Sequence, residues 1–561
     1  MSTSATESVR ILFDQRVPMR DGVTLSADLY FPAGTDAETA ERLPAILTRT
    51  PYVKASVGML AQGRYFAGRG YVFVAMDVRG RGDSDGEFVP YVNDGRDGYD
   101  AVEWCAAQPW CTGAVGTFGG SYLGRIQWLA ALEQPPHLRA MVAVVSPSDP
   151  FVETPTGLPS PMHLCWLHYV SGRVLQPMEA VEWSRVYDHL PLLTMDEAAG
   201  RTLRHWRNDV AHPQLDAYWD RICYQTRFER INVPVLHVSG WNDDEQIGTP
   251  LNFAGMTARG GTPEARANQR LLMGPWGHAV NTTSKLGEVD FGSQAIIDLY
   301  GEQVRWLDRW LKGDVAAGKD DAPVRIFIMG ENVWRDEREW PLARTAWTSY
   351  FLHSGGSANS RFGDGVLSTT APAGEEPQDG YRYDPARPVP FLTEPTSSQI
   401  GGPDDYAAVE RRDDVLVYVT EPLAEDTEVT GPIRVELYAA SSAPDTDFMA
   451  KLVDIHPNGF AQRLCDGMVR ARFRDGMDRP ALIEPGRVYQ YTIDCWNTAQ
   501  VFKAGHRVGL EIASSAFPKY DRNLNTGAPL GQTAEMAAAE QRIYHDAAHP
   551  SALVLPIIPR R

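Results

Sequence analysis

The sequence predicts a fold of two kinds of structure, an α/β domain followed by a domain of antiparallel β strands. In the first third of the chain, short apolar runs bounded by glycine and proline alternate with stretches of helical periodicity. This alternation is typical of a parallel sheet that is covered by helices on both faces. Beyond residue 346, short β segments separated by turn residues replace it, which indicates a β-sandwich. A chain of 561 residues is also too long for one ordinary hydrophobic core.

The first part of the expected α/β domain covers residues 1–147. Helices are predicted over 97–108, with Asp97 as the N-cap, and over 124–134. Buried strands are predicted where apolar runs are bounded by glycine or proline, at 23–32, 43–52, 70–80, 114–120 and 138–149.

A helical insertion is expected at residues 148–232, where tryptophan, tyrosine, histidine and leucine are frequent. Two stretches in it have helical spacing, 177–190 and 213–225. The α/β pattern resumes at 233–345, so the insertion interrupts one domain. The elements predicted there are strands within 233–243 and 269–278 and an amphipathic helix over 295–313 that ends at Gly313.

The last part, residues 346–561, is predicted to be the β-sandwich. One alanine-rich stretch, 533–544, is predicted as a helix or a loop. The predicted β segments are 415–423, 431–442, 447–455, 488–496, 506–515 and 551–558.

Composition and charge exclude several classes of function. The net charge of −19 argues against nucleic-acid binding, which needs a basic face, and no apolar run has the length of a membrane span. The polar first residues, MSTSATESVR, predict a cytoplasmic protein. The six cysteines form no metal or redox motif. His163 and His168 lack both helical ligand spacing and a third ligand, so the sequence predicts no metal and no cofactor.

The stretch 115–124, VGTFGGSYLG, contains the first candidate for a reacting side chain. Ser121 follows an apolar strand and two glycines and precedes a helical pattern. It would therefore lie on a sharp strand-to-helix turn, beside the amide donors of a helix N-terminus. The usual nucleophile motif is G-x-S-x-G, but Leu123 occupies the place of the last glycine and Gly124 follows it. By itself the motif leaves two interpretations open, a nucleophile or a small residue in a tight turn.

A nucleophilic serine requires a base and an acid that orients the base. Asp243, Asp244 and Glu245 follow one predicted strand. His278 follows the next strand, on a predicted loop near the edge of the sheet. Strand ends of α/β sheets are where such groups collect, and the order Ser, Asp, His is that of α/β-hydrolases.

Together these motifs resemble those of the cocaine esterase and X-Pro dipeptidyl-peptidase family of α/β-hydrolases, which also contains α-amino-acid ester hydrolases and cephalosporin acylases. The family's nucleophile motif, G-x-S-Y-x-G, has the displaced glycine. Its acid motif is G-W-x-D, its base motif is G-P-W-x-H, and an early Pro-Tyr supplies a hydroxyl to the oxyanion hole. The matching positions are Gly119, Ser121, Tyr122 and Gly124; Gly240, Trp241 and Asp243; Gly274, Pro275, Trp276 and His278; and Pro51 and Tyr52.

The resemblance implies an α/β-hydrolase core with an inserted helical cap and a C-terminal jelly roll. It also implies a serine hydrolase that cleaves carboxylic esters through an acyl-enzyme. Ser121 would attack the acyl carbonyl, His278 would accept its proton, and Asp243 would orient the imidazole. Tyr52 and the amide of Tyr122 would donate to the oxyanion.

The sequence leaves the substrate open beyond a small-molecule ester or amide, and it leaves a homo-oligomer open as well. Cap aromatics such as Trp166 could line an acyl pocket or could form the core of the cap. Glu245 stands where family members with α-amino substrates carry a carboxylate, but Gln246 departs from that pattern. Ester hydrolysis therefore ranks above α-amino-ester hydrolase, acylase or X-Pro aminopeptidase activity. A non-catalytic binding scaffold is the alternative from a different class.

Overall fold

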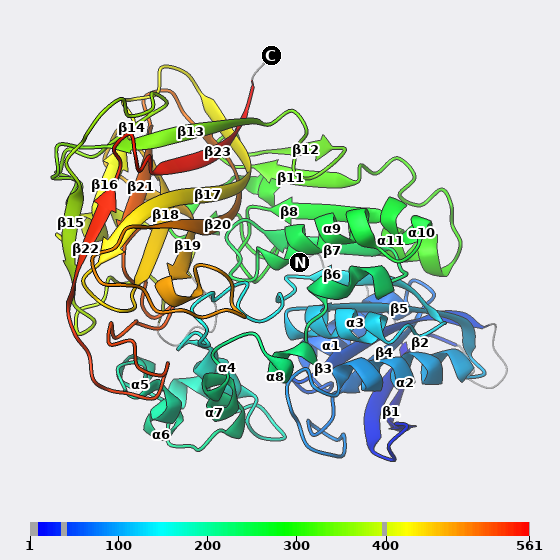
Figure 1. Ribbon diagram of the computed structural model, residues 1–561. Helices are drawn as coiled ribbons and strands as arrows, with labels where there is room; N and C mark the ends of the chain where they lie inside the picture. The colour runs from blue at the N-terminus through cyan, green and yellow to red at the C-terminus, as the bar shows by residue number, and fades with distance from the viewer. Residues whose placement is uncertain (1–8, 35–41, 395–400, 560–561) are drawn as a thin grey trace.

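A computed structural model of the protein describes residues 9–34, 42–394 and 401–559 (Figure 1). Within these residues the chain forms two large sheets, one of ten strands and one of eleven. The first sheet and its helices fill the right and lower part of Figure 1, and the second sheet forms a β domain at the upper left. The predicted fold class, an α/β core followed by a β-sandwich, is confirmed.

The first sheet has the strand order β1-β2-β4-β3-β5-β6-β7-β8-β11-β12. Its central strands, from β4 to β11 in this order, run parallel to one another, whereas β1, β2 and β12 pair antiparallel at the edges. Strands β1, β11 and β12 lie outside the predicted strands. The bounds are β1 Val9–Pro18, β2 Thr24–Pro32, β3 Leu43–Thr50, β4 Val72–Asp77, β5 Cys111–Gly120, β6 Leu138–Val144, β7 Val235–Gly240, β8 Gln269–Gly274, β11 Val324–Ile328 and β12 Val333–Glu337.

Helices bury both faces of this sheet, which explains the continuous apolar runs of its strands. Along β4, Val74 packs with residues of α2 and α3, whereas Phe73 packs with residues of α1 and α11. Successive side chains of a strand point to opposite faces, so each face contributes to a separate hydrophobic core. The helices of the core are α1 Val57–Ala67, α2 Asp94–Ala107, α3 Tyr122–Leu132, α9 Gly248–Arg259, α10 Pro263–Ala267 and α11 Leu299–Leu311.

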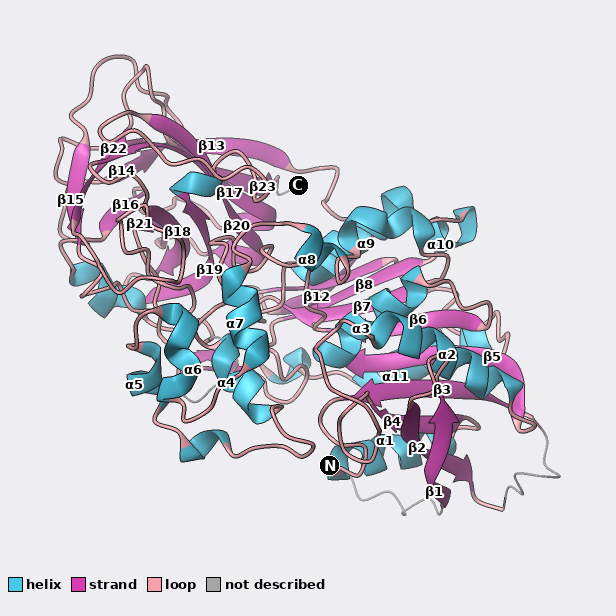
Figure 2. Ribbon diagram, turned by 60° about the horizontal axis from the view of Figure 1, so that its bottom comes forward, coloured by secondary structure: helices cyan, strands magenta, loops and turns pink. Residues whose placement is uncertain are grey.

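Between β6 and β7 the chain forms a group of short helices, which we call the cap. Figure 2 shows α4 to α7 grouped beneath the β domain and beside the α/β sheet. Cap residues such as Trp206 share a hydrophobic cluster with Phe473 and Leu530 of the β domain, and Tyr224 and Phe228 belong to a cluster of the α/β core, so the cap is packed against both domains. Its elements are α4 His163–Tyr169, η1 Met178–Ala180, α5 Trp183–Tyr187, η2 Leu192–Thr194, α6 Met195–Ala198, α7 Arg204–Ala211, α8 Ala217–Asp220 and η3 Gln225–Arg230.

Three predicted helices differ from the observed ones. Helix α2 begins at Asp94 with Asn93 as its N-cap, and the predicted cap Asp97 instead pairs with Arg79 at 2.6 Å. The stretch 177–190 is not one helix, because the extended backbone of Val181 separates η1 from α5. In the stretch 213–225, the α-helix is limited to the four residues of α8.

The second sheet belongs to the β domain. The alanine-rich stretch 533–544, predicted as a helix or a loop, contains strand β22, which pairs with β15 and β17. Ala539, Gln541 and Ile543 are buried while their neighbours are exposed or half-buried, so tertiary pairing overrides the helical propensity of the alanines. The strands are β13 Ala346–His353, β14 Val366–Ser368, β15 Asp379–Tyr383, β16 Leu416–Val419, β17 Thr427–Ser441, β18 Asp447–Ile455, β19 Ala461–Arg470, β20 Tyr489–Phe502, β21 Arg507–Ala513, β22 Ala539–Tyr544 and β23 Ala552–Ile558.

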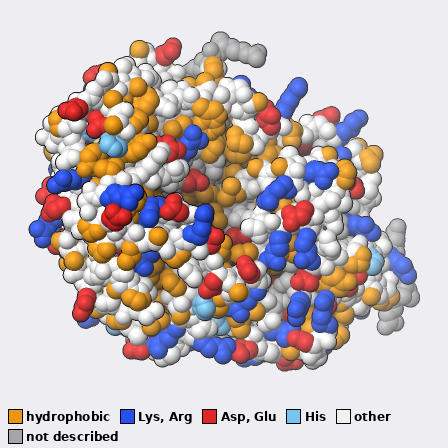
Figure 3. Space-filling view, in the orientation of Figure 1, with side chains coloured by type: hydrophobic (Ala, Val, Ile, Leu, Met, Phe, Trp, Pro, Cys, Tyr) orange, Lys and Arg blue, Asp and Glu red, His pale blue; other side chains and the backbone are white. Residues whose placement is uncertain are grey.

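Backbone hydrogen bonds join the β domain to the α/β core. The amide of Met329, just after β11, donates to the Ala499 carbonyl at 2.9 Å, and the amide of Val501 donates back to Met329 at 2.9 Å. Among the described residues, no helix is both long and apolar enough to cross a membrane. Figure 3 shows acidic and basic side chains interspersed over one face of the molecule.

Candidate active site

Ser121 occupies the turn between β5 and α3. Its φ of 60° and ψ of −127° lie in a region that non-glycine residues rarely adopt, as expected of a strained nucleophile turn. A backbone hydrogen bond to the end of β6 fixes the turn: the Ser121 amide donates to the Val144 carbonyl at 2.9 Å.

The glycines around Ser121 allow close packing. A Cβ on Gly119 would lie 2.5 Å from the Cβ of Leu123, and a Cβ on Gly124 would lie 2.9 Å from the Val144 carbonyl oxygen. The displaced glycine of the motif is therefore required where α3 crosses the end of β6.

His278 and Asp243 form a hydrogen-bonded pair behind this turn. Asp243 follows β7 and His278 follows β8, so adjacent parallel strands bring them together. The Nδ1 atom of His278 lies 2.8 Å from Oδ1 of Asp243. The buried Asp243 carboxylate also accepts hydrogen bonds from the Ser239 hydroxyl at 2.6 Å and the Glu245 amide at 3.1 Å. These bonds fix the carboxylate, which in turn fixes the imidazole.

A second carboxylate lies close to the same imidazole. Oδ1 of Asp244 is 3.3 Å from Nδ1 of His278. Burial alone would lower the pKa of His278, but the carboxylates of Asp244 and Asp243 outweigh burial and raise this pKa well above its usual range. Burial raises the pKa of Asp243, and the neighbouring His278 opposes that rise. The two carboxylates therefore stabilise the imidazolium that forms when His278 accepts a proton.

Tyr52 lines the same cavity as Ser121 and His278. The indole nitrogen of Trp166 donates to the Tyr52 hydroxyl at 3.0 Å, which leaves the Tyr52 proton available for another acceptor. Burial raises the pKa of Tyr52, and Trp166, His278 and Ser121 oppose this rise. Tyr52 is therefore a neutral hydroxyl at neutral pH. Trp166 contributes its ring to the cavity wall and its polar end to Tyr52.

The side chain of Tyr122 anchors the turn to the core. Its hydroxyl donates to Asp94 at 2.5 Å and accepts from the Tyr91 amide at 3.1 Å. Arg49 contacts the same Asp94 at 3.5 Å and donates to the Ile126 carbonyl in α3 at 3.0 Å. Burial raises the pKa of Asp94 to about 6, an effect that the nearby Arg49 opposes. The position and amide direction of Tyr122 are thus set by contacts outside the turn.

These side chains line one cavity of about 510 Å³ between the core and the cap. Tyr52, Ser121, Trp166, Glu245 and His278 all contribute to its wall. Asp243 lies behind His278. The structure thus brings every predicted site residue to one place. Which of them take part in a reaction is a separate question, taken up below.

Sequence motifs did not identify Glu153, which lies in the same cavity wall as Glu245. The two carboxyl groups are close enough to influence each other electrostatically. Burial raises the pKa of Glu153 to about 7, and burial together with Glu153 raises the pKa of Glu245 well above its usual range. Glu153 lies near the start of the insertion, where no local pattern marks it.

Gln246 does not extend this acidic pair. Its side chain is buried and accepts a hydrogen bond from the amide of Asn497 in β20 at 3.2 Å. It therefore connects the core to the β domain.

Two family models match the chain. The model of the X-Pro dipeptidyl-peptidase (S15 family) matches residues 21–280, and that of the X-Pro dipeptidyl-peptidase C-terminal non-catalytic domain matches residues 316–554. Cocaine esterase of Rhodococcus sp. (strain MB1 Bresler) is 38% identical over 97% of this chain and 98% of its own length.

Two solved structures are similar over the whole length. An α-amino acid ester hydrolase has a TM-score of 0.86 at 27% identity and covers 99% of this chain and 98% of its own. An aminopeptidase from the marine sediment archaeon Thaumarchaeota archaeon has a TM-score of 0.84 at 25% identity and covers 100% and 98%. Both proteins therefore share the α/β core and the β domain described above.

Proposed function

This chain belongs to the X-Pro dipeptidyl-peptidase (S15) family, which makes it a hydrolase, and from that premise we propose that it cleaves small carboxylic esters through a covalent acyl-serine. The observation that carries the proposal is the 2.8 Å contact between Asp243 and His278 beside the strained turn of Ser121. Nucleophile, base and orienting acid then occur in the order and strand positions that the chemistry requires.

In the proposed reaction, Ser121 Oγ attacks the acyl carbonyl while His278 accepts its proton. Asp243 holds Nδ1–H and stabilises the imidazolium. His278 then returns the proton to the leaving alcohol, and a water molecule hydrolyses the acyl-serine by the same steps. The Tyr52 hydroxyl and the Tyr122 amide are proposed to donate to the oxyanion.

An acyl-enzyme makes a specific kinetic prediction. Mixing the enzyme with an excess of a chromogenic ester is expected to release about one equivalent of alcohol in a burst before steady turnover, wherever deacylation is slower than acylation. A fluorophosphonate probe should label the same serine and abolish the burst. Well-folded protein that shows neither a burst nor labelling would contradict the proposal.

Loss of the Tyr52 hydroxyl tests the oxyanion hole. Tyr52→Phe is expected to lower kcat about a hundredfold or more, because one donor to the developing charge disappears. The ring keeps its packing against Tyr169, 6.0 Å away between centroids. Tyr169→Phe is the matched control, since Tyr169 lines the same cavity, and it should leave kcat within a fewfold of the wild-type value. An equally small effect of Tyr52→Phe would remove Tyr52 from the mechanism.

A second candidate function is hydrolysis of α-amino esters. Glu153 and Glu245 place two half-buried carboxyl groups in the cavity wall, and a substrate ammonium would allow both to ionise. The sequence pointed to Glu245 alone. The second carboxyl group, that of Glu153, strengthens the case for a substrate with a cationic acyl group.

Glu153→Gln and Glu245→Gln are each expected to lower kcat/KM for an α-amino ester, relative to its des-amino analogue, by about tenfold or more. Glu182→Gln is the control, because this cap carboxylate is 67% exposed.

The preference of the wild-type enzyme for the α-amino ester should also decline as the pH falls through about 7, because Glu153 then takes up a proton. A wild-type enzyme without any preference for the amino ester would leave simple ester hydrolysis as the function.

Other expectations stay predictions. These are the division of the chain at residues 147, 232 and 345, the cytoplasmic location and a homo-oligomeric state.

A further inference from the structure

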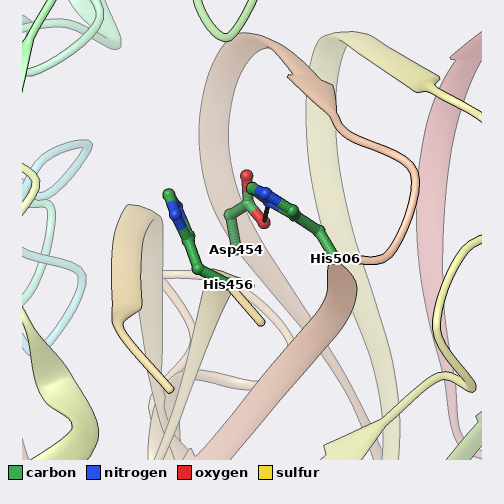
Figure 4. A group of neighbouring side chains, drawn as sticks. All are labelled: Asp454, His456 and His506. Carbon is green, nitrogen blue, oxygen red and sulfur yellow. Dashed lines mark hydrogen bonds and ion pairs between the residues drawn. The ribbon is translucent and has the colours of Figure 1, made fainter. Parts of the chain in front are cut away.

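A group of side chains of the types that ligate metals lies in the β domain, apart from the cavity of Ser121. Asp454, His456 and His506 each offer one ligand atom, and these atoms all lie within 4.8 Å of one another. Figure 4 shows the three side chains together at the end of the strands that carry them.

Strand pairing explains why these residues meet. Strands β18 and β21 are antiparallel, with Asp454 opposite Val508 and Ile455 opposite Arg507. One residue further along the same register, His456 comes opposite His506. Asp454 precedes His456 by two residues and so lies on the same face of the strand. The arrangement is therefore set by the fold of the sheet.

Each imidazole is already oriented by a hydrogen-bond partner. Nδ1 of His506 lies 2.8 Å from Oδ1 of Asp454, and Nε2 of His456 lies 3.1 Å from Oε1 of Gln462. When Nε2 of His456 donates to Gln462, Nδ1 of that ring holds a free lone pair, and histidine ligands of metals are commonly held in this way by an acceptor on the second nitrogen. At His506, the ion would take the place of the proton that Nδ1 shares with Oδ1 of Asp454, so that both of these atoms become ligands. Gln500 fixes the carboxylate from behind, through a 2.9 Å bond to Oδ2 of Asp454.

The two imidazole rings lie close together, and solvent can reach them. Their centroids are 4.3 Å apart and their planes are inclined by 36°, and the ligand atoms of both rings and of Asp454 lie within 4.8 Å of one another. The side chain of His506 is 15% exposed, whereas that of Asp454 is buried. His456 and Gln462 also line a surface cavity of about 730 Å³, which gives an ion a path of entry and a position for water as a further ligand.

We propose that Asp454, His456 and His506 bind one divalent transition-metal ion, for which Zn²⁺ is the best chemical match. Two imidazoles and one carboxylate with an open position form a donor set typical of zinc. The ion would connect the end of β18 to the start of β21 and would stabilise this corner of the β domain. It takes no part in ester cleavage.

The test uses the full-length, untagged enzyme after dialysis against a chelator, with ZnCl₂ as the probe. His278→Gln serves as the background, because Asp243, Asp244 and His278 also bring ligand atoms within 4.8 Å and could bind zinc in the active site. In this background, calorimetry is expected to show one ion per chain, and Zn²⁺ is expected to raise Tm.

Adding His456→Gln or His506→Gln should weaken Zn²⁺ binding tenfold or more and abolish the rise in Tm. His549→Gln is the matched control, since that imidazole is also hydrogen-bonded to a carboxylate in the β domain. In the otherwise natural chain, His456→Gln and His506→Gln should leave ester hydrolysis without zinc unchanged.

Unchanged zinc affinity in both variants, or the absence of binding in the His278→Gln background, would overturn the proposal. If either variant fails to fold, Co²⁺ binding to the His278→Gln protein gives the answer instead. Coordination by two imidazoles and a carboxylate should produce a visible absorption band stronger than that of aqueous Co²⁺, and the spectrum of the free ion would contradict the site.

Discussion

Ser121→Ala is expected to lower kcat for ester hydrolysis about a million-fold. The substitution removes the proposed nucleophile, and neither His278 nor the oxyanion donors can then form the acyl intermediate. Alanine keeps the Cβ of serine, and the turn at φ 60° is held by backbone bonds to Val144 and Val145, so the fold should persist. Steady-state hydrolysis of a chromogenic ester, together with thermal unfolding of both proteins, measures the effect.

Ser148→Ala is the matched control for this experiment. Ser148 lines the same cavity, and its hydroxyl accepts a hydrogen bond from Gln225 at 3.2 Å. Its loss should leave kcat within a fewfold of the wild-type value. If folded Ser121→Ala protein retains about a tenth of the wild-type kcat, Ser121 is not the nucleophile and another group performs the reaction.

Asp243→Asn is expected to lower kcat about 10⁴-fold. The amide can donate a hydrogen bond to Nδ1, so the imidazole adopts the tautomer that carries its proton on Nε2. That nitrogen can then no longer accept the proton of Ser121. In that orientation the amide nitrogen replaces Oδ1, so the hydrogen bond from the Glu245 amide is lost together with the negative charge. The measurement is kcat and kcat/KM as a function of pH.

Asp244 provides the control, because its carboxylate lies 3.3 Å from the same nitrogen. Asp244→Asn should leave the maximal kcat within a fewfold of the wild-type value. It should move the acid limb of the kcat/KM profile to lower pH. The sign follows from His278, which must be neutral to accept a proton and whose pKa Asp244 raises. If Asp244→Asn costs more activity than Asp243→Asn, Asp244 is the orienting acid.

The parallel sheet and its reactive turn could be predicted because both have local signals. A buried parallel strand is a run of apolar residues, and β4 and β5 appear in the sequence as such runs. The turn at Ser121 requires small residues on both sides, and the glycines at 119 and 124 meet that requirement. Ser121, Asp243 and His278 could be proposed because each follows a predicted strand, their order is that of α/β-hydrolases, and each lies in a short motif that resembles one of the family.

The cap and its acidic pair could not be predicted in the same way. Cap helices are so short that packing and hydrogen bonds outweigh helical periodicity, as at Val181 between η1 and α5. Glu153 and Glu245 are separated by 92 positions in the sequence, and no local rule relates them. They share one cavity wall because the start of the insertion folds over the end of β7.

The sequence by itself determined the fold class, the strained turn and the identity of the groups around it. Each of these rests on residue size, apolar periodicity or short motifs, which act over a few neighbouring positions. Tertiary structure alone decided that Asp243 lies closer to His278 than Asp244 does, at 2.8 Å against 3.3 Å. It also decided that Gln246 bonds to the β domain and that two imidazoles oppose each other across β18 and β21. Those outcomes depend on strand register and domain packing, which join residues that are distant in the chain.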